Sequence, residues 1–363
     1  MPRRMVFDRW IFFTSGLLVF LGVLMVGSSS HYLARQHDLG SHYFIARQVI
    51  HVLLAVAVLL ITMRIPYRKL ADNKIIFPAL LICLVALVLV LAMPAAGGAR
   101  RWLHLGLFRV QPSEFAKLVS ILFMAHMLSM KEKRVNDLLT VSIPCLSVVA
   151  MLAFLVVIEP DLGGAVMLAI PACVMIFVAG LHWKYVAAVA GLGTVAMTFS
   201  VLIQPYRVQR IMTFLNPESD PMSGGWQLTQ SLVAIGSGGL TGAGLGKGSQ
   251  AAHFLPEAHT DFIYSIIGEE FGFIGTILLL TAFLILLWRG LRTALRAPDR
   301  HGFYVALGIT TLLVLQGLIH MGVCVGLLPT KGLPLPFVSY GGSSLLVSVA
   351  ATGILLNVSQ HSN

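Results

Sequence analysis

Charged residues are scarce in this chain of 363 residues, and acids are the scarcest of them. Asp and Glu number 15 against 25 Lys and Arg, and the four types together make up 11% of the sequence. Because a soluble globular domain carries roughly 25% charged residues, this shortage excludes an ordinary soluble protein. The net charge of +10 does not indicate nucleic-acid binding, because most of the cations stand between apolar runs.

Cysteine is also rare. All four cysteines fall inside apolar runs and show no paired spacing: Cys83, Cys145, Cys173 and Cys324. The pattern excludes a disulfide framework and a cysteine-based zinc site. We expect these side chains to pack among apolar neighbours.

The sequence is rich in long apolar runs: 57% of the residues are hydrophobic, and the mean hydropathy is +0.86. The sequence therefore predicts an all-α polytopic membrane protein, with residues 1–363 forming one integral membrane domain. We expect about ten transmembrane helices. The predicted spans are 10–27, 44–63, 75–93, 113–130, 139–158, 162–180, 185–203, 261–288, 303–327 and 339–357.

The distribution of cations predicts the orientation. Arg3, Arg4 and Arg9 precede a first span without a small-residue cleavage site, which indicates an uncleaved start-transfer helix. With both termini in the cytoplasm, the short cytoplasmic connections hold more Arg and Lys than the outer segments do, which agrees with the positive-inside rule. Residues 204–260, between the seventh and eighth spans, then form a large extracytoplasmic loop.

That loop contains two recognisable pieces. Residues 226–235 are apolar and compatible with a helix that folds back on the membrane surface. The run GSGGLTGAGLGKGS resembles a phosphate-binding loop, but Lys247 is followed by Gly248 instead of Ser or Thr, and no strand precedes it. We interpret the run as flexible backbone.

The stretch HFLPEAHTDFIYSIIGEEFG joins this loop to the eighth span. Thr260 is suited to an N-cap, which places Asp261 in the first helical turn, where the helix dipole favours a carboxylate. At 100° per residue, Asp261 shares a face of small and polar residues with Ser265, Gly268 and Gly272. An acid at the mouth of such a groove predicts a functional site, and the alternative is that Asp261 only caps the helix.

Other acids and one lysine interrupt the apolar pattern. Glu114 and Lys117, at i and i+3, can form an ion pair or contact a substrate. Glu159 and Asp161 fall at a connection between spans, where we expect a solvated turn. Glu270 falls on the opposite helix face from Asp261, so we expect it to be paired or neutral inside the bundle.

The stretch LLPTKGLPLPFVSYGGSS brings Lys331, three prolines and several serines to the outer end of the last span. Backbone broken in this way is tolerated at membrane depth where it is buried in protein or lines a cavity. His253, Glu257 and His259 near Asp261 do not have the spacing of a compact metal site, so we expect no permanent metal.

Several separated motifs together resemble a known family. They are GARRWLHLG, QPSEFAKL, EPDLG, PYRVQRIMTFLNPESDP, GGWQLTQSLVAIGSGGLTGAGLG, LPEAHTDFIYSIIGEEFGFIG and LLPTKGLPLPFVSYGGSS. Across nearly the whole chain they resemble the SEDS family (shape, elongation, division, sporulation) of bacterial cell-wall proteins. The likeness is greater to the cell-division branch, FtsW, than to its close relative, the elongation branch RodA.

The resemblance implies a peptidoglycan glycosyltransferase that polymerises lipid II during septal wall synthesis, in the bacterial inner membrane at the division septum. It implies a class B penicillin-binding protein (FtsI-like transpeptidase) and other division proteins as partners, with lipid II and polyprenyl pyrophosphate as ligands. No cofactor is required, although a transient divalent cation would be compatible. Asp261 is the implied catalytic base, and the substrate-binding candidates are Glu114, Lys117, Arg207, Arg210, His259, Lys331, Ser343 and Ser344.

Two other functions fit the same residues. A lipid II flippase would use the same cavity without chemistry, and a noncatalytic scaffold would only assemble division partners. An elongation polymerase of the RodA type is a further alternative. Charges that hold a pyrophosphate would serve all of these, so the sequence leaves them open.

Overall fold

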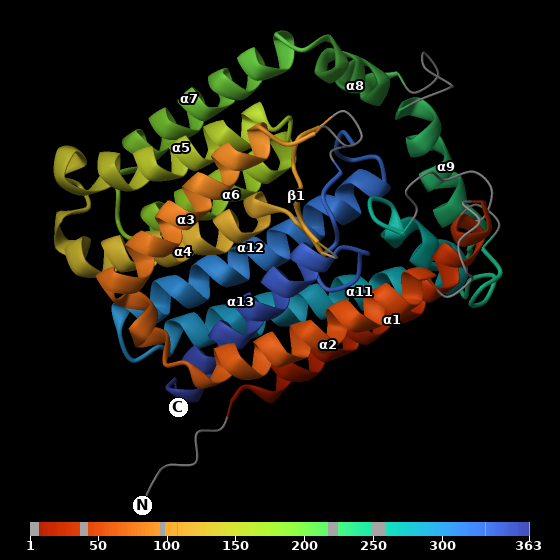
Figure 1. The fold of residues 1–363 in the computed structure, drawn as a ribbon, viewed down its shortest axis with the longest axis horizontal. Helices are drawn as coiled ribbons and strands as arrows, with labels where there is room; N and C mark the ends of the chain where they lie inside the picture. Colours follow the sequence, from red (N-terminus) through yellow and green to blue (C-terminus); the bar gives the residue numbers. More distant parts are fainter. Residues whose placement is uncertain are drawn as a thin grey trace, which may run out of the picture.

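The computed structural model describes residues 7–36, 43–94, 99–106, 108–216, 224–248, 259–330 and 332–362. Within these ranges the chain is almost entirely helical (Figure 1). Nine of the described helices are long and apolar enough to cross a membrane. They are α1 (Arg9–Gln36), α2 (Tyr43–Arg64), α3 (Asn73–Leu91), α4 (Pro112–Lys131), α5 (Ile143–Ile158, preceded by the π-helical turn η3, Leu138–Ser142), α7 (Trp183–Leu202), α11 (Ile263–Leu295), α12 (Arg300–Cys324) and α13 (Gly342–Gln360).

A tenth apolar helix, α6 (Leu162–Val178), is shorter. With it, the predicted membrane helices are all present, although several ends differ from the apolar runs. Helices α1 and α11 extend beyond residues 27 and 288, because a helix can continue past the hydrocarbon core. Short polar residues start several helices; for example, the Asp161 side chain accepts a hydrogen bond from the Gly164 N–H at 2.9 Å.

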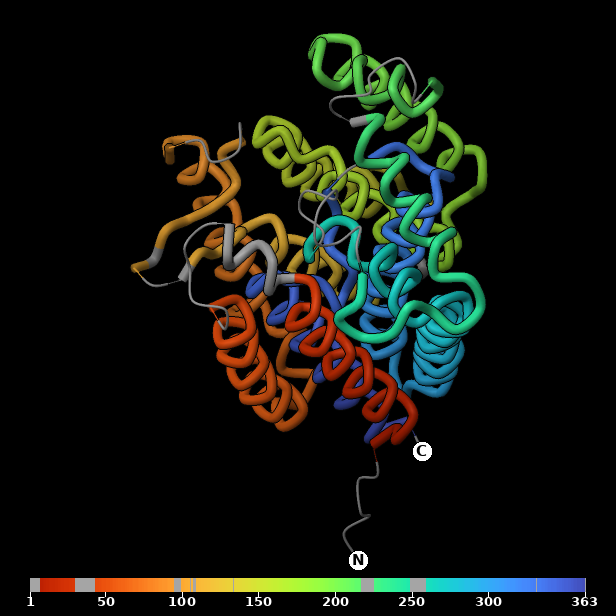
Figure 2. The backbone as a smooth tube through the Cα atoms, turned by 90° about the vertical axis from the view of Figure 1, so that its right-hand side faces the viewer, coloured from red at the N-terminus to blue at the C-terminus, as the bar shows by residue number. Residues whose placement is uncertain are grey.

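The helices form two groups around α12. Helices α3, α5 and α6 pack with α4 on one side, while α1, α2 and α13 lie with α11 on the other (Figures 1 and 2). Helices α12 and α13 are the most buried of the spans, and α7 is the least buried. Helix α7 therefore lies at the periphery, where its apolar side chains can face lipid.

The start of α1 and the end of α13 lie together at one end of the bundle. The Asp8 N–H donates a hydrogen bond to Ser359 Oγ at 3.0 Å, and the Asp8 carboxylate forms an ion pair with Arg289. The short helices α8 (Pro205–Leu215) and α9 (Gly224–Ser237) lie at the opposite end (Figure 1). Helix α9 confirms the helix predicted in the long loop.

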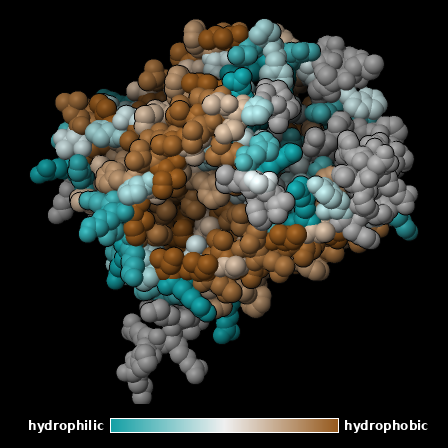
Figure 3. Space-filling view, in the orientation of Figure 1, coloured by the Kyte–Doolittle hydropathy of each residue, from teal (hydrophilic) through white to brown (hydrophobic). Residues whose placement is uncertain are grey.

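A small antiparallel hairpin, β1 (Leu103–Leu105) and β2 (Phe108–Val110), leads into α4 and was not predicted. Its register pairs Leu103 with Val110. The surface in Figure 3 shows hydrophobic side chains across the middle of the visible face and hydrophilic ones toward its two ends. This distribution fits a bundle whose middle lies in lipid.

The glycine run of the long loop is ordered, so its interpretation as flexible backbone was wrong. Helix α11 breaks at Gly272, which has a φ of +66°. The loop replaces the lost helical hydrogen bonds: Phe273 N–H donates to Gly239 O at 2.8 Å, and Ala243 N–H donates to Glu269 O at 2.9 Å. Glycine is needed here because a Cβ on Gly238 would overlap the α11 backbone.

Candidate functional site

Asp261 lies in a turn that immediately precedes α11. The prediction that it occupies the first helical turn was wrong, because Phe262 has a non-helical conformation (φ −129°, ψ 23°) and the helix begins at Ile263. Two carbonyls that would otherwise accept helical hydrogen bonds are used elsewhere. The His259 carbonyl accepts from the Tyr340 N–H at 2.9 Å, and the Thr260 carbonyl accepts from Ser339 Oγ at 2.6 Å. The segment before α13 thus fixes the turn that carries Asp261.

The small-residue face predicted for this helix is not an open groove. Ser265 is buried and shares a hydrogen bond of 2.6 Å with Ser231 of α9. A Cβ on Gly268 would contact Ile235, also of α9. Helix α9 therefore fills the face that the sequence predicted to be accessible, and Asp261 opens into a different space.

That space is a pocket between α8, α12 and the segment after α12. Its volume of about 20 Å³ is enough for one water molecule. It is lined by Arg210, Gln227, Asp261, Phe262, His320, Val323, Thr330, Gly332 and Leu333. Two predicted site residues, Asp261 and Arg210, therefore meet in one pocket, although 51 positions separate them in the sequence.

The walls of this pocket are held by backbone carbonyls. Arg210 Nη1 donates to the Thr330 carbonyl at 3.2 Å, and its guanidinium lies 4.6 Å from the centre of the Tyr206 ring. A Cβ on Gly332, whose φ is +62°, would come within 3.1 Å of Asp261 Oδ2. The chain thus passes very close to the carboxylate, where an L side chain would be strained.

A buried polar chain connects the pocket wall to α4. Lys117 Nζ lies 2.8 Å from Glu114 Oε2 and donates to Gln316 Oε1 at 2.9 Å. Gln316 Nε2 in turn donates to the Pro334 carbonyl at 2.9 Å. The predicted ion pair between Glu114 and Lys117 is present, and it supports the segment that faces Asp261.

Gln316 and His320 were not identified from the sequence. His320 Nδ1 lies 2.7 Å from the Leu333 carbonyl, so two residues on one face of α12 hold consecutive carbonyls of the segment. A signal was present, because polar side chains at i and i+4 within an apolar span indicate an internal polar face.

Arg207 has a different environment from Arg210. Its guanidinium is largely buried and donates to the Ser200 carbonyl at 2.9 Å and the Val157 carbonyl at 3.1 Å. These bonds join α8 to α7 and α5. The structure therefore places Arg207 outside the lining of the pocket, where it positions the helix that carries Arg210.

Four further predicted residues, Ser343, Ser344, His259 and Lys331, lie near the start of α13 or outside the described residues. Ser343 Oγ accepts from the Gln111 N–H at 3.0 Å, and Ser344 is buried beside it in sequence. The His259 ring packs against Phe44 and Tyr340, with ring centres 5.4 and 5.3 Å away. Lys331, predicted to bind pyrophosphate, lies outside the described residues, as do His253 and Glu257.

The EPDLG turn is buried, so the prediction of a solvated turn was wrong. Glu159 has 0% exposure, and Arg101 Nε donates to its backbone carbonyl at 3.2 Å. Burial, with a smaller contribution from the nearby Asp161, raises the pKa of the Glu159 carboxyl to about 8. Glu159 is thus held in its neutral form near pH 7. Glu270 is also buried, and it accepts a hydrogen bond from Ser28 inside the bundle, as predicted.

Comparison with known proteins gives matches over the whole chain. The model of the FtsW, RodA and SpoVE family, described as a cell cycle protein, matches residues 8–363. A probable peptidoglycan glycosyltransferase FtsW from Geobacter metallireducens is 44% identical, with 97% of this chain and 94% of the relative covered. Stage V sporulation protein E from Bacillus subtilis is 41% identical, with 95% of each chain covered.

Two solved structures share the fold. A chain of a peptidoglycan synthase complex, described as coordinating polymerization and crosslinking, is 28% identical with a TM-score of 0.79 over 98% of both chains. The rod shape determining protein RodA from Thermus thermophilus is 28% identical with a TM-score of 0.73, covering 99% of this chain and 98% of that one. The motifs, the helical bundle and these full-length matches agree: the chain belongs to the FtsW, RodA and SpoVE family of cell cycle proteins, which is the SEDS family that its sequence resembles.

Proposed function

We propose that this chain is a peptidoglycan glycosyltransferase that polymerises lipid II into glycan strands during division. The observation that supports this best is the pocket that brings the Asp261 carboxylate and the Arg210 guanidinium together at the end of the bundle distant from both termini. A base and a cation are the groups that transfer from a lipid pyrophosphate requires. The curated relatives named as probable peptidoglycan glycosyltransferases agree with this assignment.

In the proposed reaction, a hydroxyl of the acceptor sugar attacks the anomeric carbon of the donor. The new glycosidic C–O bond forms as the C–O bond to the pyrophosphate breaks, and Asp261 accepts the hydroxyl proton. The departing polyprenyl pyrophosphate takes the electron pair, and Arg210 stabilises its charge. A divalent cation carried by the pyrophosphate would add to this stabilisation, and Lys331 is a further candidate for it.

The pocket must widen to admit a sugar, because its volume of about 20 Å³ holds only one water molecule. Arg210 and Thr330 both line this pocket, and a hydrogen bond of 3.2 Å joins the Arg210 guanidinium to the Thr330 carbonyl. Breaking it frees the guanidinium for a pyrophosphate oxygen. Entry of the substrate would therefore also release the Arg210 guanidinium to bind the pyrophosphate.

The lipid tails need an apolar path to the pocket. In Figure 3, a hollow lined by hydrophobic side chains opens on the visible face between α2 and α3. Such a hollow would hold a polyprenyl chain while the sugars lie at the aqueous end of the bundle.

We further propose a place and a partner. The chain would lie in the bacterial inner membrane at the division septum, with both termini cytoplasmic and α8 and α9 outside. This orientation puts Arg64 at the end of α2, and Arg289 and Arg292 near the end of α11, on the inside. The expected partner is a class B penicillin-binding protein that crosslinks the glycan, beside other division proteins. The similar chain in a peptidoglycan synthase complex supports this partnership.

The direct test is polymerisation of lipid II by the purified protein with its transpeptidase partner. Asp261→Asn keeps the shape and removes the base, so we expect glycan product to fall by roughly 10²–10⁴-fold while folding is retained. The control is Asp72→Asn, the same change at an exposed helix N-cap that Asn also caps. Full activity of Asp261→Asn would remove this residue from the mechanism. Lipid II transfer across vesicles without any glycan product would favour a flippase instead.

A further inference from the structure

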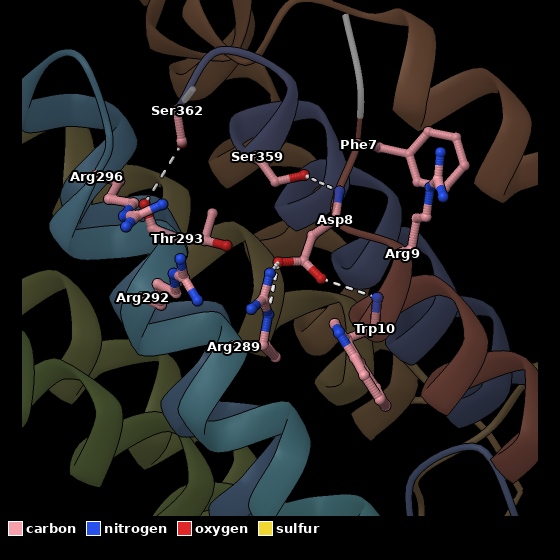
Figure 4. Close-up of a pocket in the computed structure, with 10 residues that line it drawn as sticks. All are labelled: Phe7, Asp8, Arg9, Trp10, Arg289, Arg292, Thr293, Arg296, Ser359 and Ser362. Atoms are coloured by element: carbon pink, nitrogen blue, oxygen red, sulfur yellow. Dashed lines mark hydrogen bonds and ion pairs between the residues drawn. The ribbon is translucent and has the colours of Figure 1, made fainter.

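A second pocket lies at the opposite end of the molecule, where the start of α1 meets the ends of α11 and α13. Its volume is about 260 Å³, more than ten times that of the pocket at Asp261. It is lined by Phe7, Asp8, Arg9, Trp10, Arg289, Arg292, Thr293, Arg296, Ser359 and Ser362 (Figure 4). None of these residues takes part in the proposed glycosyl transfer.

The charge of this pocket is strongly unbalanced. Arg289 and Arg292 stand at positions i and i+3 of α11, so they share one helix face, and Arg296 is the C-cap residue that directly follows the helix. Arg9 approaches from the start of α1, and the one acid in the lining is Asp8. The pocket lining therefore contains four arginines and a single acid.

The Asp8 carboxylate already has partners. Asp8 forms an ion pair with Arg289, and its Oδ1 accepts a hydrogen bond from the Trp10 N–H at 2.9 Å. Within the described residues, no hydrogen bond or ion pair to the guanidinium groups of Arg292 and Arg296 is found. Arg292 is partly buried, and a guanidinium that is held without a counter-charge favours an anion.

The surface around the pocket identifies the kind of anion. Trp10 is 58% exposed at the rim, and the exposed side chains that continue along α1 and α11 toward the membrane are apolar. They include Phe13, Leu17, Leu284, Trp288 and Leu291. Tryptophan is enriched where a membrane helix meets the headgroup region, so the pocket opens at headgroup depth with lipid-facing surface beside it.

We propose that this pocket binds the phosphate of an anionic glycerophospholipid from the leaflet that surrounds both termini. Arg292 and Arg296 bind the phosphate oxygens, the hydroxyl groups of Ser359 and Ser362 lie within the same lining, and the acyl chains run along the apolar faces of α1 and α11. A basic pocket between membrane helices suits such a headgroup. A bound lipid would hold α1 against α11, next to the ion pair between Asp8 and Arg289.

The test is a titration of the full-length purified protein with phosphatidylglycerol or phosphatidylcholine of identical acyl chains, followed by native mass spectrometry. We expect the wild type to prefer phosphatidylglycerol. Arg292→Gln with Arg296→Gln should weaken that binding by about 30-fold, from two interfacial cations. Arg292→Lys with Arg296→Lys keeps both charges and should retain most of the affinity.

The control, Arg64→Gln with Arg134→Gln, removes two exposed arginines outside the pocket lining and should leave the affinity unchanged. Equal binding of both lipids, or unchanged affinity in the glutamine double variant, would overturn the proposal. So would glycerol phosphate competing fully with the lipid, since the site would then recognise a free phosphate. Displacement of the lipid by an acidic peptide at equal concentration would assign the pocket to a protein partner instead.

Discussion

Replacing Lys117 by Met tests the polar chain that supports the wall of the Asp261 pocket. The side chains of Lys117 and Glu114 are 1% and 6% exposed and lie 2.8 Å apart, so water screens their attraction poorly. At an effective dielectric constant of about 20, two unit charges at this distance attract by about 6 kcal/mol before the cost of desolvation. Removing one partner leaves a buried charge without compensation, so we expect Lys117→Met to lower the free energy of unfolding by about 3–5 kcal/mol.

A double-mutant cycle separates this effect from the loss of the lysine side chain itself. Glu114→Gln with Lys117→Met leaves no buried charge, so it should regain most of the stability, measured by unfolding in mixed micelles of increasing SDS content. It should not regain polymerisation, because the donor to Gln316 Oε1 is still missing and the segment at Pro334 loses its support. A loss of less than about 1 kcal/mol in Lys117→Met would refute the uncompensated-charge reasoning. Full activity of the stable double variant would show that the hydrogen bonds from Lys117 through Gln316 to Pro334 do not position the pocket.

Three further predictions concern other parts of the molecule. The pKa of Glu159 is raised to about 8, so between about pH 4.5 and pH 8 the folded state keeps a proton that the unfolded state has lost. The melting temperature of the protein, measured by circular dichroism, should therefore fall as the pH rises through this range. The melting temperature of Glu159→Gln should fall less. Gly238→Ala should lower the free energy of unfolding by several kcal/mol, because its Cβ would overlap the α11 backbone. The control is Gly236→Ala in α9, where a Cβ meets open space. It should be neutral or stabilising by up to about 1 kcal/mol, as measured by unfolding in SDS mixed micelles. In a cysteine-free background, an impermeant thiol reagent added to cells should label Leu245→Cys and should not label Arg296→Cys. Labelling of Arg296→Cys would show that the proposed orientation is wrong.

Hydropathy was sufficient to predict the membrane helices, because each span must satisfy its own backbone hydrogen bonds in lipid and is therefore a local property. Helix ends were less predictable. Helix α11 continues to Leu295 through Arg289 and Arg292, since helix-forming residues need not stop at the hydrocarbon boundary. The hairpin before α4 has only three residues in each strand, too few for a pattern of alternation to identify it.

For the candidate site, the sequence indicated which residues to consider but not how they are arranged, and their roles stay a prediction. Asp261 was identified because an acid at a membrane boundary is costly, and Glu114 with Lys117 because their spacing is local. The i and i+4 spacing of Gln316 and His320 indicates a polar face, but it does not reveal their partners, which are carbonyls more than ten residues away. Burial of Glu159 was missed for the same reason: the turn is covered by neighbours distant in the sequence, among them Arg101.

The error at the glycine run explains the error on the face of α11. A helical projection from Asp261 through Gly272 assumes one continuous helix, and Gly272 interrupts it with a φ of +66°. The interruption is tolerated in a membrane helix only because Gly239 and Leu240 supply carbonyls for the freed N–H groups of Phe273 and Ile274. The glycine run and the break therefore depend on each other, and neither can be interpreted alone. Their mutual fit fixes α9 against α11, which closes the predicted groove and leaves the pocket with Arg210 as the space that Asp261 faces.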